Sequence, residues 1–309
     1  MTSVLVFDSK NRNPLGFLAR LVADALAENA AVGRCRLAGS WDIGRALAEQ
    51  RYDLGLVFGG EQLTPDLVAA CRARTDRLCL WTTEDPYELD QIMPLADRFD
   101  LVFSNDAAAA RLYPRGRYLP LGFPDALGRR LGRQPKQLDF VYLGKGWPNR
   151  VEILERVLAA SEGLARSVRV TDPVQAVSHR PGVTVGPNLA YTAYLTLLAS
   201  ARTCLVVGRD YSTNPGPNSQ PRSVSPPPRF FECLGLGTVS VVLGAPFEPR
   251  ETLAPTRAVY CATPEDLGAA IREALAMPPT PAADADGFSL SASIGRLIAA
   301  MTEQAVGNA

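Results

Sequence analysis

The sequence predicts an α/β protein made of two doubly wound domains, each with a parallel sheet covered by helices. The chain has 309 residues, about twice the length of a common single domain. Short apolar runs of strand length alternate along it with amphipathic stretches of helix length, which is typical of parallel sheets joined by helices. This periodicity is lost in the middle of the chain, over Phe123–Gln137, where Gly, Pro, Arg and Lys gather as in a linker.

The first half of the chain alternates short apolar runs with amphipathic segments. We predict strands at Val4–Asp8, Gly33–Leu37, Asp53–Phe58, Leu78–Thr82, Leu101–Ser104 and Tyr118–Leu121. We predict helices at Leu15–Glu28, Ile43–Glu49, Pro65–Arg74, Tyr87–Ala96 and Ala107–Tyr113. These elements make a first Rossmann-like domain, which we place at residues 1–125.

The second half repeats the same alternation. We predict strands at Asp139–Leu143, Val168–Val170, Val183–Val185, Cys204–Val207, Val239–Leu243 and Ala258–Cys261. We predict helices at Asn149–Leu164, Ala190–Ala201, Arg229–Leu236, Glu265–Ala276 and, at the end of the chain, Leu290–Ala305. A second Rossmann-like domain is therefore expected over residues 126–309, with the terminal helix as part of it. The two domains are expected to face each other across a cleft, where the carboxyl ends of the strands would bind ligands.

The charge balance restricts the kinds of partner. Lys and Arg total 32 and Asp and Glu total 32, so the average surface does not attract nucleic acid or anionic lipid, and any anion site must be local. A basic run from Arg111 to Lys136 is interpreted as a solvated face, with attraction of a polyanionic acceptor such as nucleic acid as the alternative. The single histidine, His179, excludes a histidine-rich metal site, so catalysis would depend on carboxylates, arginines and backbone amides.

The six cysteines and the chain start point to a reducing compartment. No CxxC pair occurs, and four of the cysteines lie in apolar segments, so we expect reduced structural thiols and no metal. The first residues enter a strand pattern directly, and no segment has about 18 uncharged apolar residues. We therefore predict a cytoplasmic protein without a membrane span.

The first turn of the second domain has the features of a phosphate site. The run LDFVYLGKGWPNR places Gly144 and Gly146 around Lys145, with Arg150 in the first turn of the next helix. Glycines let the backbone approach a ligand, and helix amides beside Lys and Arg suit phosphate oxygens. The alternative is an ordinary glycine-containing turn with a solvated lysine. The chain has no GxxxxGK[ST] motif and no convincing GxGxxG, which disfavours a P-loop ATPase and a dinucleotide enzyme.

A long polar loop leads into the helix PRFFECLGLG, where Arg229 and Glu232 fall at i and i+3 on one face. A carboxylate there could accept both hydroxyls of a ribose, while Arg229 and the first helical amides would stabilise phosphate. The alternative is an ordinary exposed ion pair within the helix, which would contribute under about 0.5 kcal/mol.

Two further groups of polar residues follow strands of the first domain. Glu84 and Asp85 follow the strand ending at Thr82, and either carboxylate could take a proton from an acceptor hydroxyl as general base. Alternatively, Asp85 caps a helix begun by Pro86. Asp8 and the loop after it, with Asn11, are a second candidate region for contact with the acceptor.

These motifs resemble the CgeB-like (spore-maturation-protein) glycosyltransferases, which have two Rossmann domains in the GT-B arrangement. The resemblance is carried by LDFVYLGKGWPNR, by a later helix with Tyr194, and by SPPPRFFECLGLGTVSVV; in the first domain it extends to LCLWTTEDPYELD, FDLVFSND and YLPLG. It implies a donor-binding second domain in which Glu232 holds the nucleotide ribose. Lys145, Arg150 and Arg229 would contact the diphosphate or the nearby sugar, with Gly144 and Tyr194 also in the donor site.

The resemblance predicts a metal-independent glycosyltransferase without a cofactor. It would move a sugar from a nucleotide diphosphate sugar such as a UDP-sugar to an acceptor, which could be a small molecule, a glycan, a protein or a nucleic acid. Related retaining enzymes often carry a second glutamate seven intervening residues before the ribose glutamate, and this position is Val224 here. The alternatives are a non-catalytic protein that binds a nucleotide or sugar, and a nucleotide-sugar epimerase or phosphorylase of the same architecture.

Overall fold

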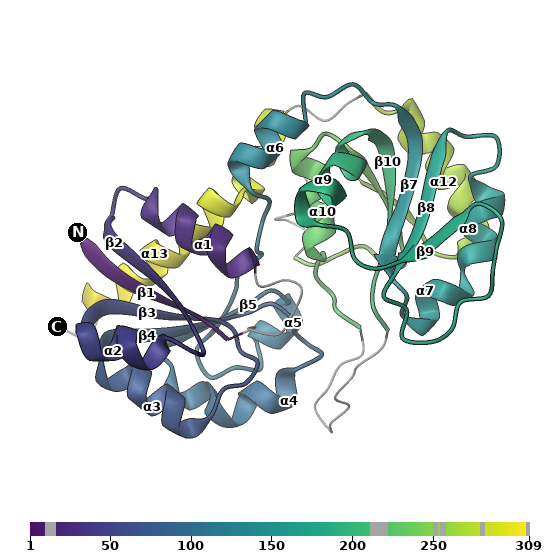
Figure 1. The fold of residues 1–309 in the computed structure, drawn as a ribbon. Coiled ribbons are helices and arrows are strands. Elements are labelled where there is room, and N and C mark those ends of the chain that lie inside the picture. Colours follow the sequence, from purple (N-terminus) through teal and green to yellow (C-terminus); the bar gives the residue numbers. More distant parts are fainter. Residues whose placement is uncertain (10–16, 211–221, 250–252, 254–257, 279–281, 307–309) are drawn as a thin grey trace. The chain divides into compact units, whose positions relative to one another are not determined.

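The chain forms two compact α/β units in the computed structural model (Figure 1), which describes residues 1–9, 17–210, 222–249, 253, 258–278 and 282–306. The first unit consists of Met1–Leu121 together with the segment that begins at Leu290. The second unit begins at Gly122 and ends at Ser289. Each unit has a six-stranded parallel sheet between layers of helices, so the predicted fold class of two Rossmann-like domains is confirmed.

The first sheet has the strand order β2-β1-β3-β4-β5-β6. Its strands are β1 (Thr2–Asp8), β2 (Val32–Gly39), β3 (Tyr52–Gly59), β4 (Thr75–Thr82), β5 (Leu101–Ser104) and β6 (Gly116–Tyr118). Each overlaps a predicted strand, but β6 ends earlier than expected. The amide of Leu119 still donates to the carbonyl of Ser104 in β5 at 2.8 Å, but the carbonyl of Leu119 accepts a hydrogen bond from Trp81 Nε1 at 3.1 Å, so the strand pairing ends here.

The helices of the first unit cover both faces of this sheet. They are α1 (Phe17–Ala27), α2 (Ile43–Glu49), α3 (Pro65–Ala73), α4 (Leu89–Ile92), η1 (Met93–Arg98), α5 (Ala107–Ala110) and α13 (Leu290–Val306). The single helix predicted over Tyr87–Ala96 is instead a short α-helix followed by a 3₁₀ helix. Pro94 lies at the start of the 3₁₀ segment, where it lacks the amide that a continuous α-helix would use.

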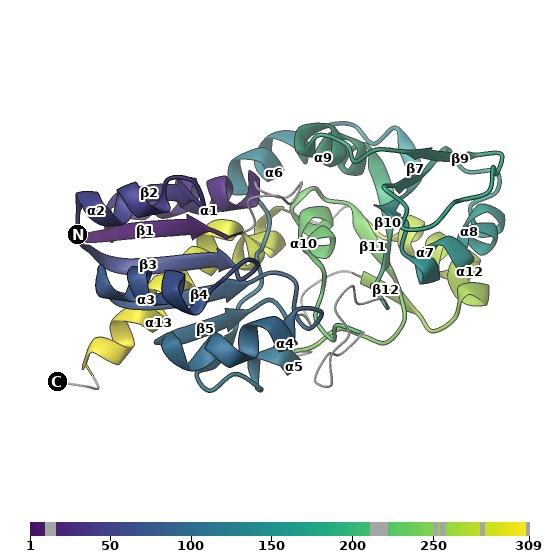
Figure 2. The same cartoon turned by 60° about the horizontal axis from the view of Figure 1, so that its bottom comes forward.

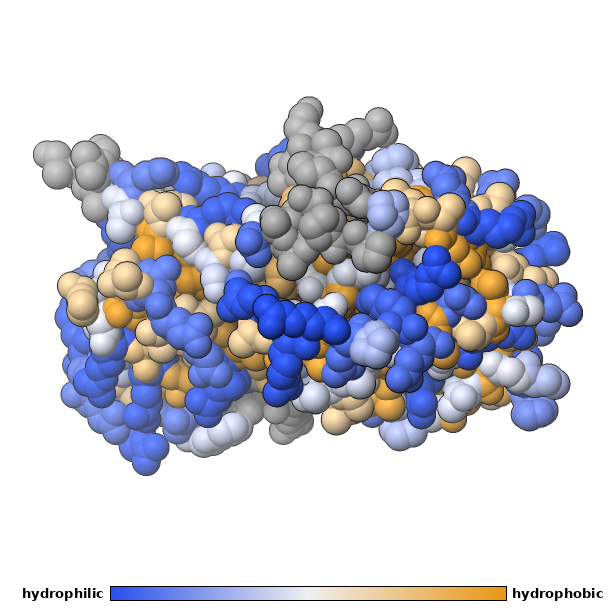
Figure 3. Space-filling view, turned by 90° about the horizontal axis from the view of Figure 1, so that it is seen from above, coloured by the Kyte–Doolittle hydropathy of each residue, from blue (hydrophilic) through white to orange (hydrophobic). Residues whose placement is uncertain are grey.

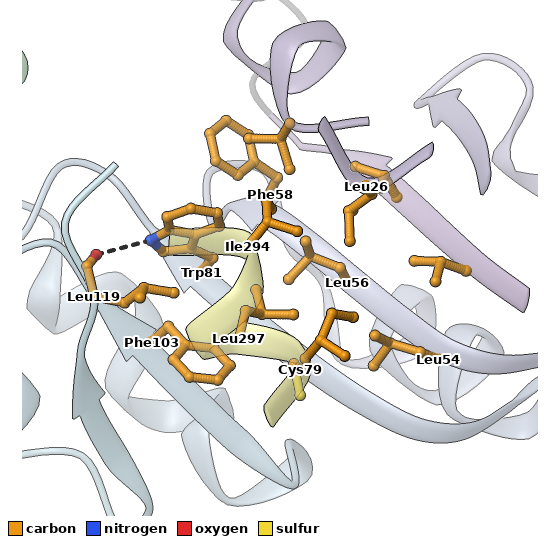
Figure 4. Close-up of a cluster of buried hydrophobic side chains, with 14 of the residues drawn as sticks. Leu26, Leu54, Leu56, Phe58, Cys79, Trp81, Phe103, Leu119, Ile294 and Leu297 are labelled. Carbon is orange, nitrogen blue, oxygen red and sulfur yellow. Dashed lines mark hydrogen bonds between the residues drawn. The ribbon is translucent and has the colours of Figure 1, made fainter. Parts of the chain in front are cut away.

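The terminal helix α13 belongs to the first unit, which corrects its expected place in the second domain. It lies beside α1 on one face of the first sheet (Figure 1) and contributes Ile294 and Leu297 to the core. Figure 4 shows these side chains against Phe58 and Trp81, whose rings meet edge to face at 5.7 Å. The apolar spacing of this helix predicts a buried face, but it does not say which sheet that face covers.

The second sheet has the strand order β12-β11-β10-β7-β8-β9. Its strands are β7 (Leu138–Lys145), β8 (Arg166–Thr171), β9 (Val183–Gly186), β10 (Ala201–Val207), β11 (Val239–Leu243) and β12 (Ala258–Cys261), each at or overlapping a predicted position. Along the chain, β8 and β9 are added on one side of β7, and β10, β11 and β12 follow on its other side. The boundary between β7 and β10 is therefore the switch point at which open α/β sheets bind ligands.

The helices of the second unit also form two layers (Figure 2). They are α6 (Asp125–Leu131), α7 (Pro148–Glu152), α8 (Leu154–Ala160), α9 (Tyr191–Ala199), α10 (Pro228–Gly235), η2 (Pro264–Asp266), α12 (Leu267–Ala276) and η3 (Ala282–Phe288). Helices α9 and α10 pack on one face of the sheet and α8 and α12 on the other. Helix α6 lies within the predicted linker Phe123–Gln137. It is helical because Leu127 and Leu131, four residues apart, pack against α9 and α10.

Hydrophilic and hydrophobic residues are intermingled on the visible face of each unit (Figure 3). No helix in the described part of the chain is both long and apolar enough to cross a membrane.

Lys136 lies inside the second unit, and not on the solvated basic face expected from the sequence. Its ammonium group donates to the carbonyls of Ala199 and Leu236, at 2.9 Å each, and to the hydroxyl of Thr238 at 3.0 Å. Lys136 therefore ties the ends of α9 and α10 together. Burial lowers its pKa from 10.5 to about 8.

We expect the substitution Leu297→Ala in α13 to lower the free energy of unfolding by about 2 to 5 kcal/mol, because it opens a cavity in the core of the first unit. Urea denaturation followed by Trp fluorescence measures this change. The matched control is Thr302→Ala at an exposed position of the same helix, which should change stability by less than about 0.5 kcal/mol. Equal stability of the two variants would contradict the assignment of α13 to this core.

Lys136 predicts a pH dependence of stability. Between about pH 8 and its usual pKa of 10.5, the unfolded chain keeps the Lys136 proton and the folded chain has released it. The contribution of Lys136 to the free energy of unfolding of the protein therefore rises as the pH is raised across this window. We expect this rise in the wild type and its loss in Lys136→Met, measured by urea denaturation at several pH values. Lys145→Met, at an exposed lysine, should keep the rise; if both variants keep it, the buried amine is not its source.

Candidate functional site

The second unit gathers its predicted site residues where β7 and β10 end. These strands are neighbours, and they end at Lys145 and Val207 respectively. Gly144 lies one residue before the end of β7, and Arg150 lies in α7, directly after it. The predicted phosphate-binding residues therefore lie at the switch point of this sheet.

Two arginines converge on the backbone of Gly144. A Cβ atom at this position would lie 3.7 Å from Nη1 of Arg150, 3.7 Å from Nη1 of Arg229 and 3.7 Å from the hydroxyl of Tyr142. Arg150 comes from α7 and Arg229 from the start of α10, so residues far apart in the sequence meet here. Any longer side chain at position 144 would enter the space that the two guanidinium groups face.

Each guanidinium group is held through one nitrogen and presents another to Gly144. Arg150 donates from Nη2 to the carbonyl of Val207 at 2.8 Å. Arg229 donates from Nε to the hydroxyl of Tyr194 at 3.2 Å and lies over the ring of Tyr194, 5.8 Å from its centroid. Both Nη1 atoms therefore have fixed positions at this edge of the sheet, which is a suitable arrangement for binding an anion through planar forks.

Glu232 is buried one turn after Arg229, with 5% of its surface exposed. Its carboxylate accepts a hydrogen bond from Tyr194 at 2.5 Å on Oε2 and one from Tyr191 at 2.9 Å on Oε1. Arg229 and Glu232 are thus linked through the hydroxyl of Tyr194. The exposed intrahelical ion pair that was the alternative interpretation does not describe this arrangement.

The surroundings of Glu232 set its electrostatics. Burial raises the pKa of its carboxyl, and the hydrogen bonds from Tyr194 and Tyr191, with the charge of Arg229, act in the opposite direction. Burial also raises the pKa of Tyr194, and the nearby charge of Glu232 raises it further. Burial and the charge of Glu232 raise the pKa of Tyr191 as well, so both tyrosines stay protonated and donate their hydrogens to the carboxylate.

The remaining predicted donor residue, Lys145, is exposed at the end of β7, with its ammonium group 4.5 Å from the centroid of the Trp147 ring. The structure also adds two residues that the sequence analysis did not single out. Tyr142 lies beside the two arginines, and Tyr191 stacks on Tyr194 with ring centroids 6.0 Å apart. Their spacing offers a signal in retrospect, because Tyr191 precedes Tyr194 by three residues on one face of α9.

In the first unit, Asp85 lies inside the protein, with 1% of its surface exposed. Its carboxylate accepts hydrogen bonds from the hydroxyls of Thr82, Ser104 and Tyr113, the last two at 2.6 and 2.9 Å. Burial raises the pKa of this carboxyl, and the three donors oppose the shift. Asp85 is therefore not a helix cap, which was the alternative interpretation. Its hydrogen-bond donors are side-chain hydroxyls and not helix amides, and the next helix, α4, begins only at Leu89.

The other predicted residues of the first unit lie along the carboxyl edge of its sheet. Glu84 is half-buried beside Asp85, after β4, and Asp8 is half-buried at the end of β1. Strand β3 separates β1 from β4, so these two positions are roughly 10 Å apart across the sheet. Ser9 donates to the carbonyl of Phe58 at 2.8 Å and accepts from the amide of Gly60 at 2.7 Å, which fixes the start of the loop after β1. Asn11 lies outside the described residues.

The structure shows all six cysteines as free thiols, five of them buried and Cys35 half-buried. Over the part of the chain that is described, no group of three or more His, Cys, Asp or Glu side chains is placed to hold a metal ion.

The fold of the chain is similar to that of several solved structures. A structure of AviGT4, a glycosyltransferase involved in avilamycin A biosynthesis, aligns with a TM-score of 0.66 at 15% identity over 99% of both chains. A putative UDP-N-acetylglucosamine 2-epimerase from Listeria monocytogenes aligns with a TM-score of 0.62 at 11% identity, over 98% of this chain and 97% of that one. Anabaena HepE in complex with UDP-glucose aligns with a TM-score of 0.58 at 12% identity, over 98% and 100%.

No family model and no curated protein matches the sequence. At these identities the structural similarity shows the fold alone. Two six-stranded parallel sheets with alternating helices, matched over nearly the whole chain by these neighbours, identify the fold as GT-B.

Proposed function

We propose that the protein is a glycosyltransferase that moves a sugar from a nucleotide diphosphate sugar to an acceptor hydroxyl without a metal ion. The observation that carries the proposal is the convergence of Arg150 and Arg229 on Gly144, beside the buried carboxylate of Glu232. The resemblance of the surrounding motifs to CgeB-like glycosyltransferases supports it, as do structural neighbours that include a glycosyltransferase and a protein bound to UDP-glucose.

In this proposal, Glu232 holds the donor ribose. The two tyrosine hydrogen bonds fix the carboxylate, yet each oxygen has two lone-pair sites and receives one tyrosine hydroxyl. The carboxylate therefore keeps the capacity to accept hydrogen bonds from two ribose hydroxyls. A hydrogen bond to an ionised partner in a buried place is among the stronger polar contacts in proteins, which suits Glu232 to anchoring a nucleotide.

The diphosphate would lie against Lys145, Arg150 and Arg229. As the sugar bond breaks, negative charge grows on the departing diphosphate, and cations that are already in place stabilise it without further rearrangement. Arg150 and Arg229 meet this requirement because each is anchored through a second nitrogen. The second unit is thus proposed to bind the donor and the first to bind the acceptor.

Glu84 is the proposed general base on the acceptor side. It is half-buried after β4, next to Asp85, whose three hydroxyl donors hold the turn in place. We assign proton removal from the acceptor to Glu84 and a supporting role to Asp85, with Asp8 and Asn11 contacting the acceptor. Transfer would require the two units to bring Glu84 to the donor sugar.

A nucleotide-sugar epimerase is the second candidate, because structural neighbours of the same fold include UDP-N-acetylglucosamine 2-epimerases. Incubation with a panel of UDP-sugars separates the two functions. A glycosyltransferase releases UDP as it transfers sugar to an acceptor or to water, whereas an epimerase converts the sugar and leaves the nucleotide sugar as its product.

We expect Glu232→Ala to weaken the binding of UDP by about 1 to 3 kcal/mol, since a buried charged hydrogen-bond acceptor is lost. Isothermal titration calorimetry measures the change. Glu232→Gln, which retains the side-chain volume, separates loss of binding from loss of folding, and Glu162→Ala at an exposed glutamate of the same unit should bind UDP like the wild type. Wild-type affinity in both Glu232 variants would rule out the ribose assignment.

Glu84→Gln should lower turnover by about 100-fold or more, the contribution typical of a general base, and leave the affinity for UDP unchanged. The assay is release of UDP from a UDP-sugar that the wild type uses. Glu61→Gln is the matched control, because Gly59 pairs with Thr82 and Glu61 therefore follows β3 just as Glu84 follows β4. Full activity in Glu84→Gln, or its loss in Glu61→Gln alone, would overturn the assignment.

A further inference from the structure

One aromatic ring in the second unit supports two cations. The ammonium group of Lys145 lies 4.5 Å from the centroid of the Trp147 ring, and the guanidinium carbon of Arg209 lies 4.9 Å from it. Trp147 itself is buried, with 5% of its surface exposed. Both distances are within the range in which the face of an indole ring attracts a cation.

The turn that carries Trp147 is rigid. Gly146 donates its amide to the carbonyl of Thr171 at 2.9 Å. A Cβ atom on Gly146 would lie 2.6 Å from Cβ of Pro173, so a side chain has no room here. The backbone that carries Lys145 and Trp147, on either side of this glycine, is therefore held in one arrangement.

The segment that follows Trp147 also holds the backbone from which Arg209 projects. Asn149 donates from Nδ2 to the carbonyl of Gly208 at 3.0 Å, and Arg150 donates from Nη2 to the carbonyl of Val207 at 2.8 Å. Arg209 is the next residue along the chain. The end of β10 is thus attached to the start of α7 at two consecutive carbonyls, and the Trp147 ring supports the side chain that emerges there.

Two cations held by one ring at the carboxyl ends of neighbouring parallel strands suit a ligand with several negative charges, such as a diphosphate. Lys145 ends β7, the strand that also carries Gly144, and Arg150 and Arg229 face Gly144 from the other elements. Arg209 adds a cation from the segment that directly follows β10, the second strand of the switch point. The positive charge therefore comes from residues at the carboxyl ends of both strands that border the proposed donor site, and from the helices beside them.

We infer that Arg209 binds the diphosphate of the nucleotide donor together with Lys145, and that Trp147 is a positioning residue that holds both cations. This inference rests on the proposed function, because it assigns further residues to the same donor site. It differs from that proposal in depending on Arg209 and Trp147, which do not take part in holding the ribose.

The test compares the binding of UDP with that of uridine, which lacks the phosphates, by isothermal titration calorimetry. We expect Arg209→Gln to weaken UDP binding by about 10- to 100-fold, as for loss of a charge-assisted hydrogen bond, and to change uridine binding by less than about 2-fold. Trp147→Leu should weaken UDP binding by about 3- to 30-fold with the same selectivity. Trp147→Phe keeps an aromatic face and should restore most of the affinity.

The control is Arg156→Gln, which removes an exposed arginine of α8 in the same unit and should bind UDP like the wild type. If the wild type binds no UDP, the proposed donor site fails and the inference with it. If the wild type binds UDP and Arg209→Gln binds it equally well, only the inference is overturned. Equal losses of UDP and uridine binding in Trp147→Leu, without rescue by Trp147→Phe, would show that Trp147 supports the fold alone.

Discussion

The candidate donor site depends on one buried carboxylate, that of Glu232. An ionised carboxylate inside a protein is strongly disfavoured unless its oxygens are hydrogen-bonded, and here Tyr191 and Tyr194 supply one donor to each oxygen. The hydroxyl of Tyr194 also accepts from Arg229, so the position of that arginine follows from the same contacts. Helices α9 and α10 are thereby joined at the place where Arg229 must reach Gly144.

The first unit buries a carboxylate in a comparable way, with a different consequence. Asp85 accepts from the hydroxyls of Thr82, Ser104 and Tyr113, so β4, β5 and the segment after α5 are joined at one point beneath the edge of the sheet. Glu232 remains next to a cation, whereas the nearby charge that acts on Asp85 is that of Asp106, which raises its pKa further. Asp85 therefore stabilises the turn, and the neighbouring Glu84 is better placed for chemistry.

The sequence was sufficient to predict the strands of both described sheets, because apolar runs of strand length alternate with amphipathic helices. The resemblance to CgeB-like glycosyltransferases groups Gly144, Arg150, Arg229 and Glu232 in one donor site, and in the structure both arginines lie near Gly144. The sequence was not sufficient where long-range packing decides. The apolar face of Leu290–Val306 is visible in the sequence, but its preference for the first sheet depends on the shape of the core around Trp81. The burial of Asp85 could not be predicted from the sequence either, because its hydrogen-bond partners Ser104 and Tyr113 are 19 and 28 residues away in the chain.

The shortage of lysine is reflected in the residues of the proposed anion site. Lys136 is used inside the second unit to bind the ends of two helices, so Lys145 and arginines must supply the positive charge. Arginine suits this task because one nitrogen of its planar group can be anchored while another faces the ligand. Arg150 is anchored on Val207 and Arg229 on Tyr194, and both present Nη1 at Gly144. A chain with no net charge can thus concentrate a positive field at one strand edge, where screening by salt is weaker for partly buried groups than on the open surface.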